Sequence, residues 1–160
     1  MAIDYTAAAR AAARRYCGWH VTPVETETIT VDGPGGLVLS LPTLRLVELM
    51  SITENGRPVD PATLLVSPNT GQVRKQSGAH WTSNPGGITV EMEHGFDEAP
   101  DFDAAVEQAA SALQAASERR DPALIGQRVD DVEYRWAVTL LRDTPLNESM
   151  LAAYRILPQP

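Results

Sequence analysis

Hydrophobic positions change their spacing twice along the chain, from a helical period to an alternating one and back again. The first helical stretch covers positions 4–16, is rich in alanine, the strongest helix former, and is followed by Gly18 as a C-terminal stop. Its apolar face is mostly methyl groups, so we expect this helix to pack closely against another backbone or a partner rather than to fill a wide core. The residues of that face are Tyr5, Ala8, Ala9, Ala12 and Tyr16.

From about position 24 to 95 the spacing is that of strands. Polar and apolar residues alternate over 25–31 and again over 88–94. The Asn55-Gly56 pair between two β-favouring stretches is the usual signal of a two-residue hairpin, and the turn residues at 68–71 predict a second one. The region is therefore predicted to be antiparallel β, interrupted by a loop over 78–87 that carries Trp81.

Helical spacing returns over positions 102–119, where acidic residues stand at the start and basic ones at the end. We expect a strand or loop over 125–141, then a short helix that begins near Thr144 and Pro145, and an extended tail to position 160. The predicted fold class is α+β in one domain of 160 residues. A small helical core (an N-terminal alanine-rich helix, a central helix and a short C-terminal helix) carries an antiparallel β insertion.

The net charge and the cysteine content exclude some classes of function. The net charge of −8 repels phosphate, so nucleic-acid binding is not expected as the primary task. The single cysteine, Cys17, has no partner for an intramolecular disulfide, which suits a reducing cytoplasm. Neither a signal peptide nor a membrane-spanning segment is expected from the hydropathy of the chain.

No pattern of reactive side chains predicts an enzyme. Cys17 and His20 stand three residues apart, as metal ligands can, but a zinc site needs four donors and a second paired cluster. The glycine-rich run at 33–36 is not followed by the lysine of a phosphate-binding loop, and no serine stands in a nucleophile elbow. We therefore predict no catalytic residues, no metal and no cofactor.

Three segments in a fixed order resemble one family of structural proteins. They are the helix end Arg15-Tyr16-Cys17-Gly18-Trp19-His20-Val21, the strand pair around 44–59, and the alternating segment with its acidic continuation at 88–100. In this order they resemble the head-to-tail adaptors of actinobacterial siphophages. The resemblance extends over nearly the whole chain and rests on the order of segments, because no single motif among them is specific.

The resemblance implies a virion protein made in the host cytoplasm. Such adaptors form a ring of about a dozen copies beneath the portal protein, joined below to a stopper, neck or tail-terminator protein. The genome would pass through the ring without specific binding, and no membrane is involved. The resemblance further implies that the C-terminal segment reaches into the portal, and its aromatic, basic and aliphatic residues suit an interface. These residues are Tyr154, Arg155, Ile156, Leu157 and Pro158.

Contacts between neighbouring copies are predicted from charge. Two arginine doublets, Arg14-Arg15 and Arg119-Arg120, end predicted helices, where the helix dipole alone is a sufficient reason for them. In a ring they would meet an acidic segment of the next copy, which contains Asp97, Asp101 and Asp103.

Two other functions stay open at this point. One is a stopper or tail-completion protein lower in the same connector. The other is a small ligand-binding β domain with Trp81 and Trp136 as pocket walls.

Overall fold

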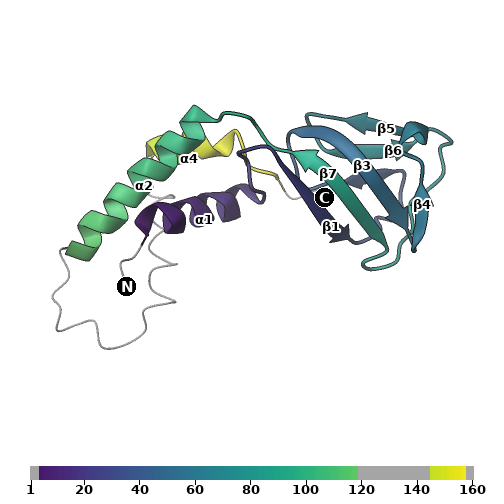
Figure 1. Cartoon of the computed structure of the whole chain (residues 1–160), viewed down its shortest axis with the longest axis horizontal. Coiled ribbons are helices and arrows are strands. Elements are labelled where there is room, and N and C mark those ends of the chain that lie inside the picture. Colours follow the sequence, from purple (N-terminus) through teal and green to yellow (C-terminus); the bar gives the residue numbers. More distant parts are fainter. Residues whose placement is uncertain (1–3, 119–144, 158–160) are drawn as a thin grey trace. The chain divides into compact units, whose positions relative to one another are not determined.

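The computed structural model describes residues 4–118 and 145–157, which divide into two compact units. Met1–His20 and Ala99–Pro160 belong to the first, called here the helical unit, and Val21–Glu98 form the second, the β unit. Figure 1 labels most of their elements. The fold is α+β, as the sequence predicts. The strand or loop expected over 125–141 and the N-cap expected at Thr144 lie outside the described residues.

The first helix of the helical unit, α1, covers Tyr5–Cys17. The carboxylate of Asp4 caps its start by accepting a hydrogen bond of 2.9 Å from the Ala7 amide. Gly18 ends it with a φ of 86°, a left-handed conformation that glycine adopts without strain, and donates to the Arg14 carbonyl over 2.8 Å. The predicted helix and its glycine stop are confirmed.

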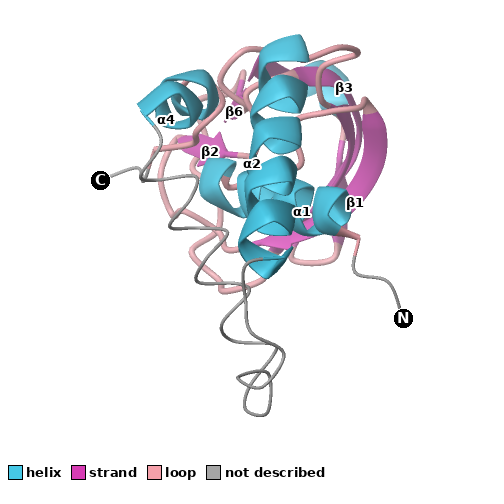
Figure 2. Cartoon of the chain, turned by 90° about the vertical axis from the view of Figure 1, so that its left-hand side faces the viewer, coloured by secondary structure: helices cyan, strands magenta, loops and turns pink. Residues whose placement is uncertain are grey.

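Two further helices complete this unit, α2 over Pro100–Glu118 and α4 over Pro145–Ala152. The sequence pattern placed the start of α2 at 102, yet Pro100 is its first residue, a position where proline costs no hydrogen bond. Figure 2 shows α1 and α2 side by side. The Tyr5 hydroxyl lies 2.6 Å from the Ser117 hydroxyl, close to the far end of α2, so the two helices run antiparallel.

Small side chains set this close packing. The buried alanines of α1 and α2 are Ala9, Ala12, Ala13, Ala105, Ala109 and Ala110. Phe102 and Leu151 fill the remaining space and are fully buried. Close packing is confirmed for Ala9 and Ala12 of the predicted face, because only side chains of this size allow two helix backbones to approach closely. Ala8 of that face is exposed, and Ala13, which the predicted face left out, is buried.

The β unit consists of two antiparallel sheets. The first has the order β1-β7-β3-β4, with β1 at Glu25–Val31, β7 at Ile88–His94, β3 at Leu46–Glu54 and β4 at Arg57–Val59. The second has the order β2-β6-β5, with β2 at Val38–Ser40, β6 at Gln72–Lys75 and β5 at Leu64–Ser67. A short 3₁₀ helix, η1, covers Pro61–Thr63. The predicted antiparallel insertion is confirmed.

Both predicted hairpins are present. Asn55 and Gly56 join β3 to β4 with φ values of 52° and 75°, the left-handed pair that a two-residue hairpin turn requires. The turn at 68–71 joins β5 to β6. In both places a local residue signal was sufficient to define the connection.

Side chains from both sheets meet in one core. Its buried members are Leu39, Leu41, Leu46, Ile52, Leu64, Val73, Trp81, Ile88, Val90 and Met92. Trp81 is only 2% exposed, and its indole nitrogen donates to the Val73 carbonyl over 3.2 Å. The interpretation of Trp81 as a pocket wall is therefore wrong, because its loop directs the indole into the core; Trp136 lies outside the described residues.

Candidate functional site

The C-terminal segment of the chain is bound to the end of α1. The indole nitrogen of Trp19 donates to the Tyr154 carbonyl over 2.7 Å, and the Ile156 amide donates to the Cys17 carbonyl over 2.9 Å. Between these bonds the Arg155 guanidinium lies 5.0 Å from the centre of the Tyr16 ring, within cation–π range. We call these three contacts the tail clamp. They fix the backbone of positions 154–156 within the helical unit.

Tyr154 also holds the start of α2. Its hydroxyl donates a hydrogen bond to the Asp101 carboxylate, and its ring meets that of Phe102 edge-on, with centroids 6.1 Å apart. Burial raises the pKa of the Tyr154 phenol to about 12, and the hydrogen bond and charge of Asp101 act in the same direction. The phenol thus stays protonated and keeps donating throughout the physiological range.

Cys17, the last residue of α1, is a packing residue. It is fully buried, and its thiol contacts the Leu151 carbonyl at 3.8 Å. Burial raises the pKa of the thiol to about 12, with the positive charge of Arg155 opposing the shift. Because the thiolate is the reactive form, this environment does not produce a nucleophile.

The native Cys17 thiol is expected to react very slowly with an aromatic disulfide reagent at pH 8. A pKa near 12 leaves a thiolate fraction of about 10⁻⁴, and burial blocks approach of the reagent. Absorbance of the released thiol should rise within seconds in guanidinium and over hours in its absence. A Ser51→Cys variant, with an exposed thiol, serves as the reactive control. Complete labelling of native Cys17 within seconds would contradict this placement.

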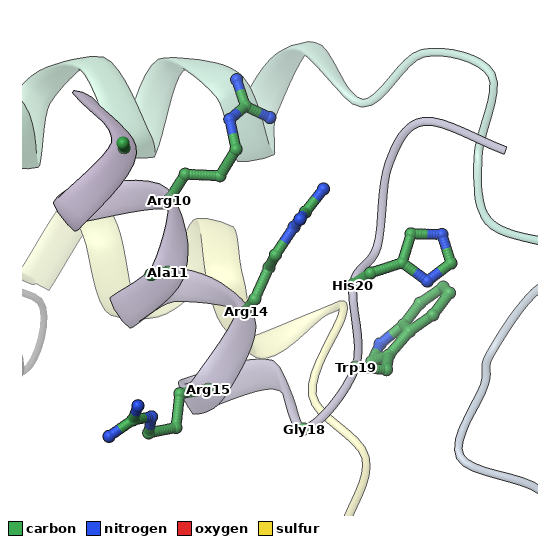
Figure 3. Close-up of a pocket in the computed structure, with 8 residues that line it drawn as sticks. Arg10, Ala11, Arg14, Arg15, Gly18, Trp19 and His20 are labelled. Carbon is green, nitrogen blue, oxygen red and sulfur yellow. The ribbon is translucent and has the colours of Figure 1, made fainter. Parts of the chain in front are cut away.

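An open groove of about 700 Å³ lies along α1, and Figure 3 shows the residues around it. Arg10, Arg14 and Arg15 give it positive charge, and Trp19 and His20 line its end with ring centroids 5.6 Å apart. Figure 3 shows Arg10 and Arg14 projecting together from one side of the helix and Arg15 from another. Guanidinium groups in an open groove suit recognition of carboxylates rather than a catalytic step.

The acidic residues predicted for contact between copies have different environments. Asp101 accepts from Tyr154, and Asp103 forms an ion pair of 3.0 Å with Arg10. Asp97 is exposed and belongs to the β unit. Arg119 and Arg120 lie outside the described residues. Two of the three predicted carboxylates therefore already have partners within their own chain.

Arg10 is a site residue that sequence reasoning missed. It stands four positions before Arg14, and residues at this spacing share one face of a helix. That spacing is visible in the sequence, but the predicted contacts rest on the arginine doublet at the helix end. Arg14 and Arg15 lie in the last turn of α1, as predicted; Arg14 is half-buried and Arg15 is exposed.

The predicted portal-docking residues fall into two groups. Tyr154, Arg155 and Ile156 take part in the tail clamp. Leu157 is 65% exposed, the largest exposed fraction among the large hydrophobic side chains of the described residues, and Pro158 lies outside them. The clamp was not foreseen, since its two sides are 135 positions apart between Trp19 and Tyr154.

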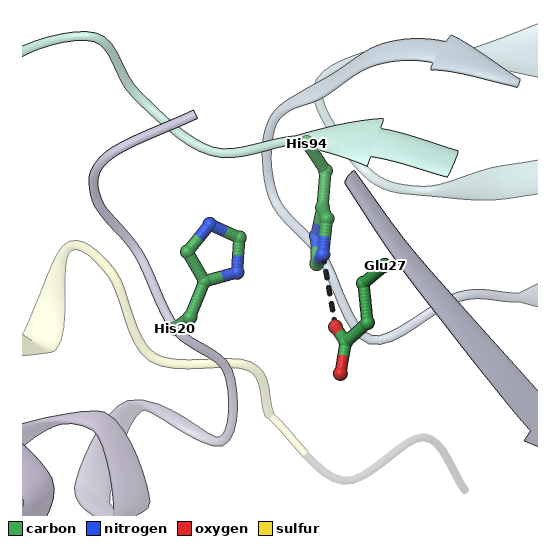
Figure 4. A group of neighbouring side chains, drawn as sticks. All are labelled: His20, Glu27 and His94. Carbon is green, nitrogen blue, oxygen red and sulfur yellow. Dashed lines mark hydrogen bonds and ion pairs between the residues drawn. The ribbon is translucent and has the colours of Figure 1, made fainter. Parts of the chain in front are cut away.

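His94 is a further residue that the sequence left without a role. It is buried in the β unit, and its Nε2 lies 3.1 Å from a carboxylate oxygen of Glu27, as Figure 4 shows. The β1–β7 register pairs Glu27 with Met92, so His94 is the diagonal neighbour of Glu27 on the adjacent strand. The pair links two strands of the sheet, and a correct register would have revealed it.

Comparison with known proteins identifies the fold. No protein-family model and no curated protein matches the chain. Several chains of solved structures are similar to it. The neck of the native gene transfer agent (GTA) particle computed with C12 symmetry gives a TM-score of 0.63 at 16% identity, covering 98% of this chain and 82% of that one. This chain and that neck chain share a fold.

Two other structures contain chains of the same fold. The neck of the empty GTA particle computed with C6 symmetry gives a TM-score of 0.60 at 15% identity, covering 98% of this chain and 78% of that one. The virion of the native GTA particle gives a TM-score of 0.58 at 17% identity, covering 98% of this chain and 77% of that one.

Over positions 4–118 and 145–157, no helix is long and apolar enough to cross a membrane.

Proposed function

We propose that this protein is a structural component of the neck of a phage-like particle, a head-to-tail adaptor that forms a ring between the portal and the tail. The observation that carries the proposal is the fold shared over 98% of the chain with a chain of a C12-symmetric neck. We propose a ring of about a dozen identical copies, which is consistent with the C12 symmetry of that neck, since head-to-tail contacts close when the rotation between copies divides a full turn. The function is mechanical, with no enzymatic step assigned to any residue.

The tail clamp supports a role for the C-terminus in portal binding. A segment that reaches a partner binds more tightly when its origin is fixed, because less conformational entropy is lost on binding. The clamp provides this fixed origin at Ile156, and Leu157 follows it as an exposed apolar side chain. We therefore assign Tyr154, Arg155 and Ile156 to holding the tail, and Leu157 and Pro158 to contacting the portal.

Two truncated chains distinguish the residues that hold the tail from those that contact the portal. A chain that ends at Ile156 keeps every clamp contact, so we expect its unfolding temperature to stay within about 2 °C of the full chain while portal binding is lost. A chain that ends at Ala153 lacks the clamp and should lose stability as well. Light scattering of each chain, alone and mixed with the cognate portal, measures the mass of the complex. A Leu37→Ala variant, which removes an exposed leucine elsewhere, is the matched control.

The outcomes distinguish the adaptor from its alternative. Unchanged portal binding by the chain that ends at Ile156 would disprove the docking role of the tail. Failure of the full chain to join the portal would place the protein lower in the neck, as a stopper or tail-completion protein. The net charge of −8 fits either position, because an acidic channel repels passing DNA and prevents adhesion.

We also propose a role for the α1 groove in the ring. Asp101 and Asp103 have partners in their own chain, so the exposed Asp97 is the remaining carboxylate of the predicted set that suits the arginines of a neighbouring copy. Arg14 and Arg15 line the groove that would receive it, whereas Arg10 is already paired with Asp103.

A further inference from the structure

Two irregularities in β3 expose apolar side chains on the outside of the β unit. The pairing of β3 with β7 shifts register between Leu46 and Glu48 and again between Leu49 and Ser51. Val47 and Met50 are the extra residues at these two bulges, opposite no residue of β7. They are 51% and 47% exposed. A bulge changes the direction in which a side chain points, and each of these two bulges exposes a large hydrophobic residue to solvent.

Carboxylates surround these two residues. The register pairs Glu48 of β3 with Glu93 of β7, and Ser51 with Glu91, whose carboxylate accepts from the Ser51 hydroxyl over 3.2 Å. Like charges directly opposite one another on adjacent strands destabilise a sheet, so the Glu48–Glu93 pair favours an external positive charge. We call the surface formed by Val47, Glu48, Met50, Glu91 and Glu93 the acidic face.

The second sheet exposes a complementary surface. Arg74 of β6 lies between Val38 of β2 and Leu65 of β5 in the register. Arg74 is exposed, Leu65 is 56% exposed and Val38 is half-buried. We call Val38, Leu65 and Arg74 the arginine face.

The two faces lie on opposite sides of the β unit. Residues that alternate with those of the arginine face, such as Leu39, Val66 and Val73, pack on the shared core from the second sheet. Ile52, Val90 and Met92 pack on it from the first. Because successive side chains on a strand point to opposite faces, the remaining residues of each sheet point outward, away from the other sheet.

We propose that the acidic face of one copy binds the arginine face of the next copy in the ring. The inference rests on the proposed adaptor function and names the surfaces by which copies meet. Both faces combine exposed aliphatic side chains with opposite charge, so apolar contact supplies affinity while charge sets orientation. Since the faces differ and lie on opposite sides, each copy offers one to each neighbour, a head-to-tail contact that a closed ring requires.

Charge reversal tests the pairing. Each single variant, Arg74→Glu or Glu93→Arg, should raise the protein concentration required for assembly on the portal by about 10-fold or more. The double variant should restore assembly at the wild-type concentration. Arg57→Glu reverses an exposed arginine outside both faces and is the matched control. Circular dichroism of each variant confirms that the β unit folds. Assembly by Arg74→Glu at wild-type concentrations would overturn the inference and leave the adaptor function intact.

Cross-linking tests the orientation. A Met50→Cys, Leu65→Cys double variant should form a ladder of disulfide-linked oligomers under mild oxidation. Each single variant should not, because the new thiol at position 50 would face Leu65 of the next copy, and the thiol at position 65 would face Met50. A dimer from Met50→Cys alone would show that identical faces meet and would overturn the head-to-tail arrangement. The wild-type chain, whose Cys17 is buried, is the control for adventitious linkage. A wild-type chain that forms no ring alone or on the portal overturns the adaptor function together with this inference.

Discussion

Replacing Trp81 by alanine is expected to lower the free energy of unfolding of the β unit by about 3–5 kcal/mol. The indole is 2% exposed and packs among the apolar side chains of both sheets. Its removal leaves a cavity and deprives the Val73 carbonyl of a donor at 3.2 Å. It also removes the ring beneath the Lys75 ammonium, which lies 4.6 Å from its centre.

Guanidinium unfolding followed by far-ultraviolet circular dichroism measures this loss. A Val47→Ala variant, changed at a half-exposed aliphatic position of the same unit, should shift the free energy by less than about 0.5 kcal/mol. Trp81→Phe retains most of the ring volume and should fall between the two. If Trp81→Ala unfolded at the same guanidinium concentration as the control, the loop would not contribute to the core.

Trp19→Ala is the second large effect, with an expected loss of about 3–5 kcal/mol in the helical unit. The indole is buried, and its nitrogen donates to the Tyr154 carbonyl over 2.7 Å. The substitution therefore removes both packing at the end of α1 and the first contact of the tail clamp. We expect the C-terminal segment to separate from α1 more often, which under the proposed adaptor function would also weaken portal binding.

Trp19→Phe separates these two contributions. Phenylalanine keeps the aromatic packing but has no indole donor, so the expected cost is about 1–3 kcal/mol from the carbonyl left unpaired. Hydrogen exchange at the Ile156 amide, which donates to the Cys17 carbonyl, reports opening of the clamp and should quicken in both variants. The Ala7 amide, bonded to the Asp4 cap at the other end of α1, is the internal reference. Unchanged exchange at Ile156 would mean that Trp19 does not hold the tail.

Features encoded by neighbouring residues could be read from the sequence. The Asn55-Gly56 turn needs left-handed backbone at both positions, which these residues tolerate, and the β3–β4 hairpin follows. Alternation alone identifies β7, whose buried residues are every second one. The helix end at Gly18 is equally local, because glycine is the residue that adopts its φ without cost.

Features that depend on residues far apart in the chain could not be predicted from the sequence. The bulges at Val47 and Met50 arise from the pairing of β3 with a strand about forty positions later, and β3 shows no local break. The tail clamp likewise joins opposite ends of the chain. Trp81 was misjudged because a loop position suggests exposure, whereas the burial of a loop side chain depends on the sheets beneath it.

The hairpin of β3 and β4 has a consequence for solubility. Glu54 and Arg57 flank the two-residue turn and form its hydrogen-bonded pair, so the backbone nitrogen of the next residue, Pro58, points to the open edge of the sheet. Proline has no hydrogen to donate there, and an incoming strand finds no donor at the middle of β4. A protein proposed to gather many copies at one vertex is thereby protected, along this edge, from growth into fibres by strand addition.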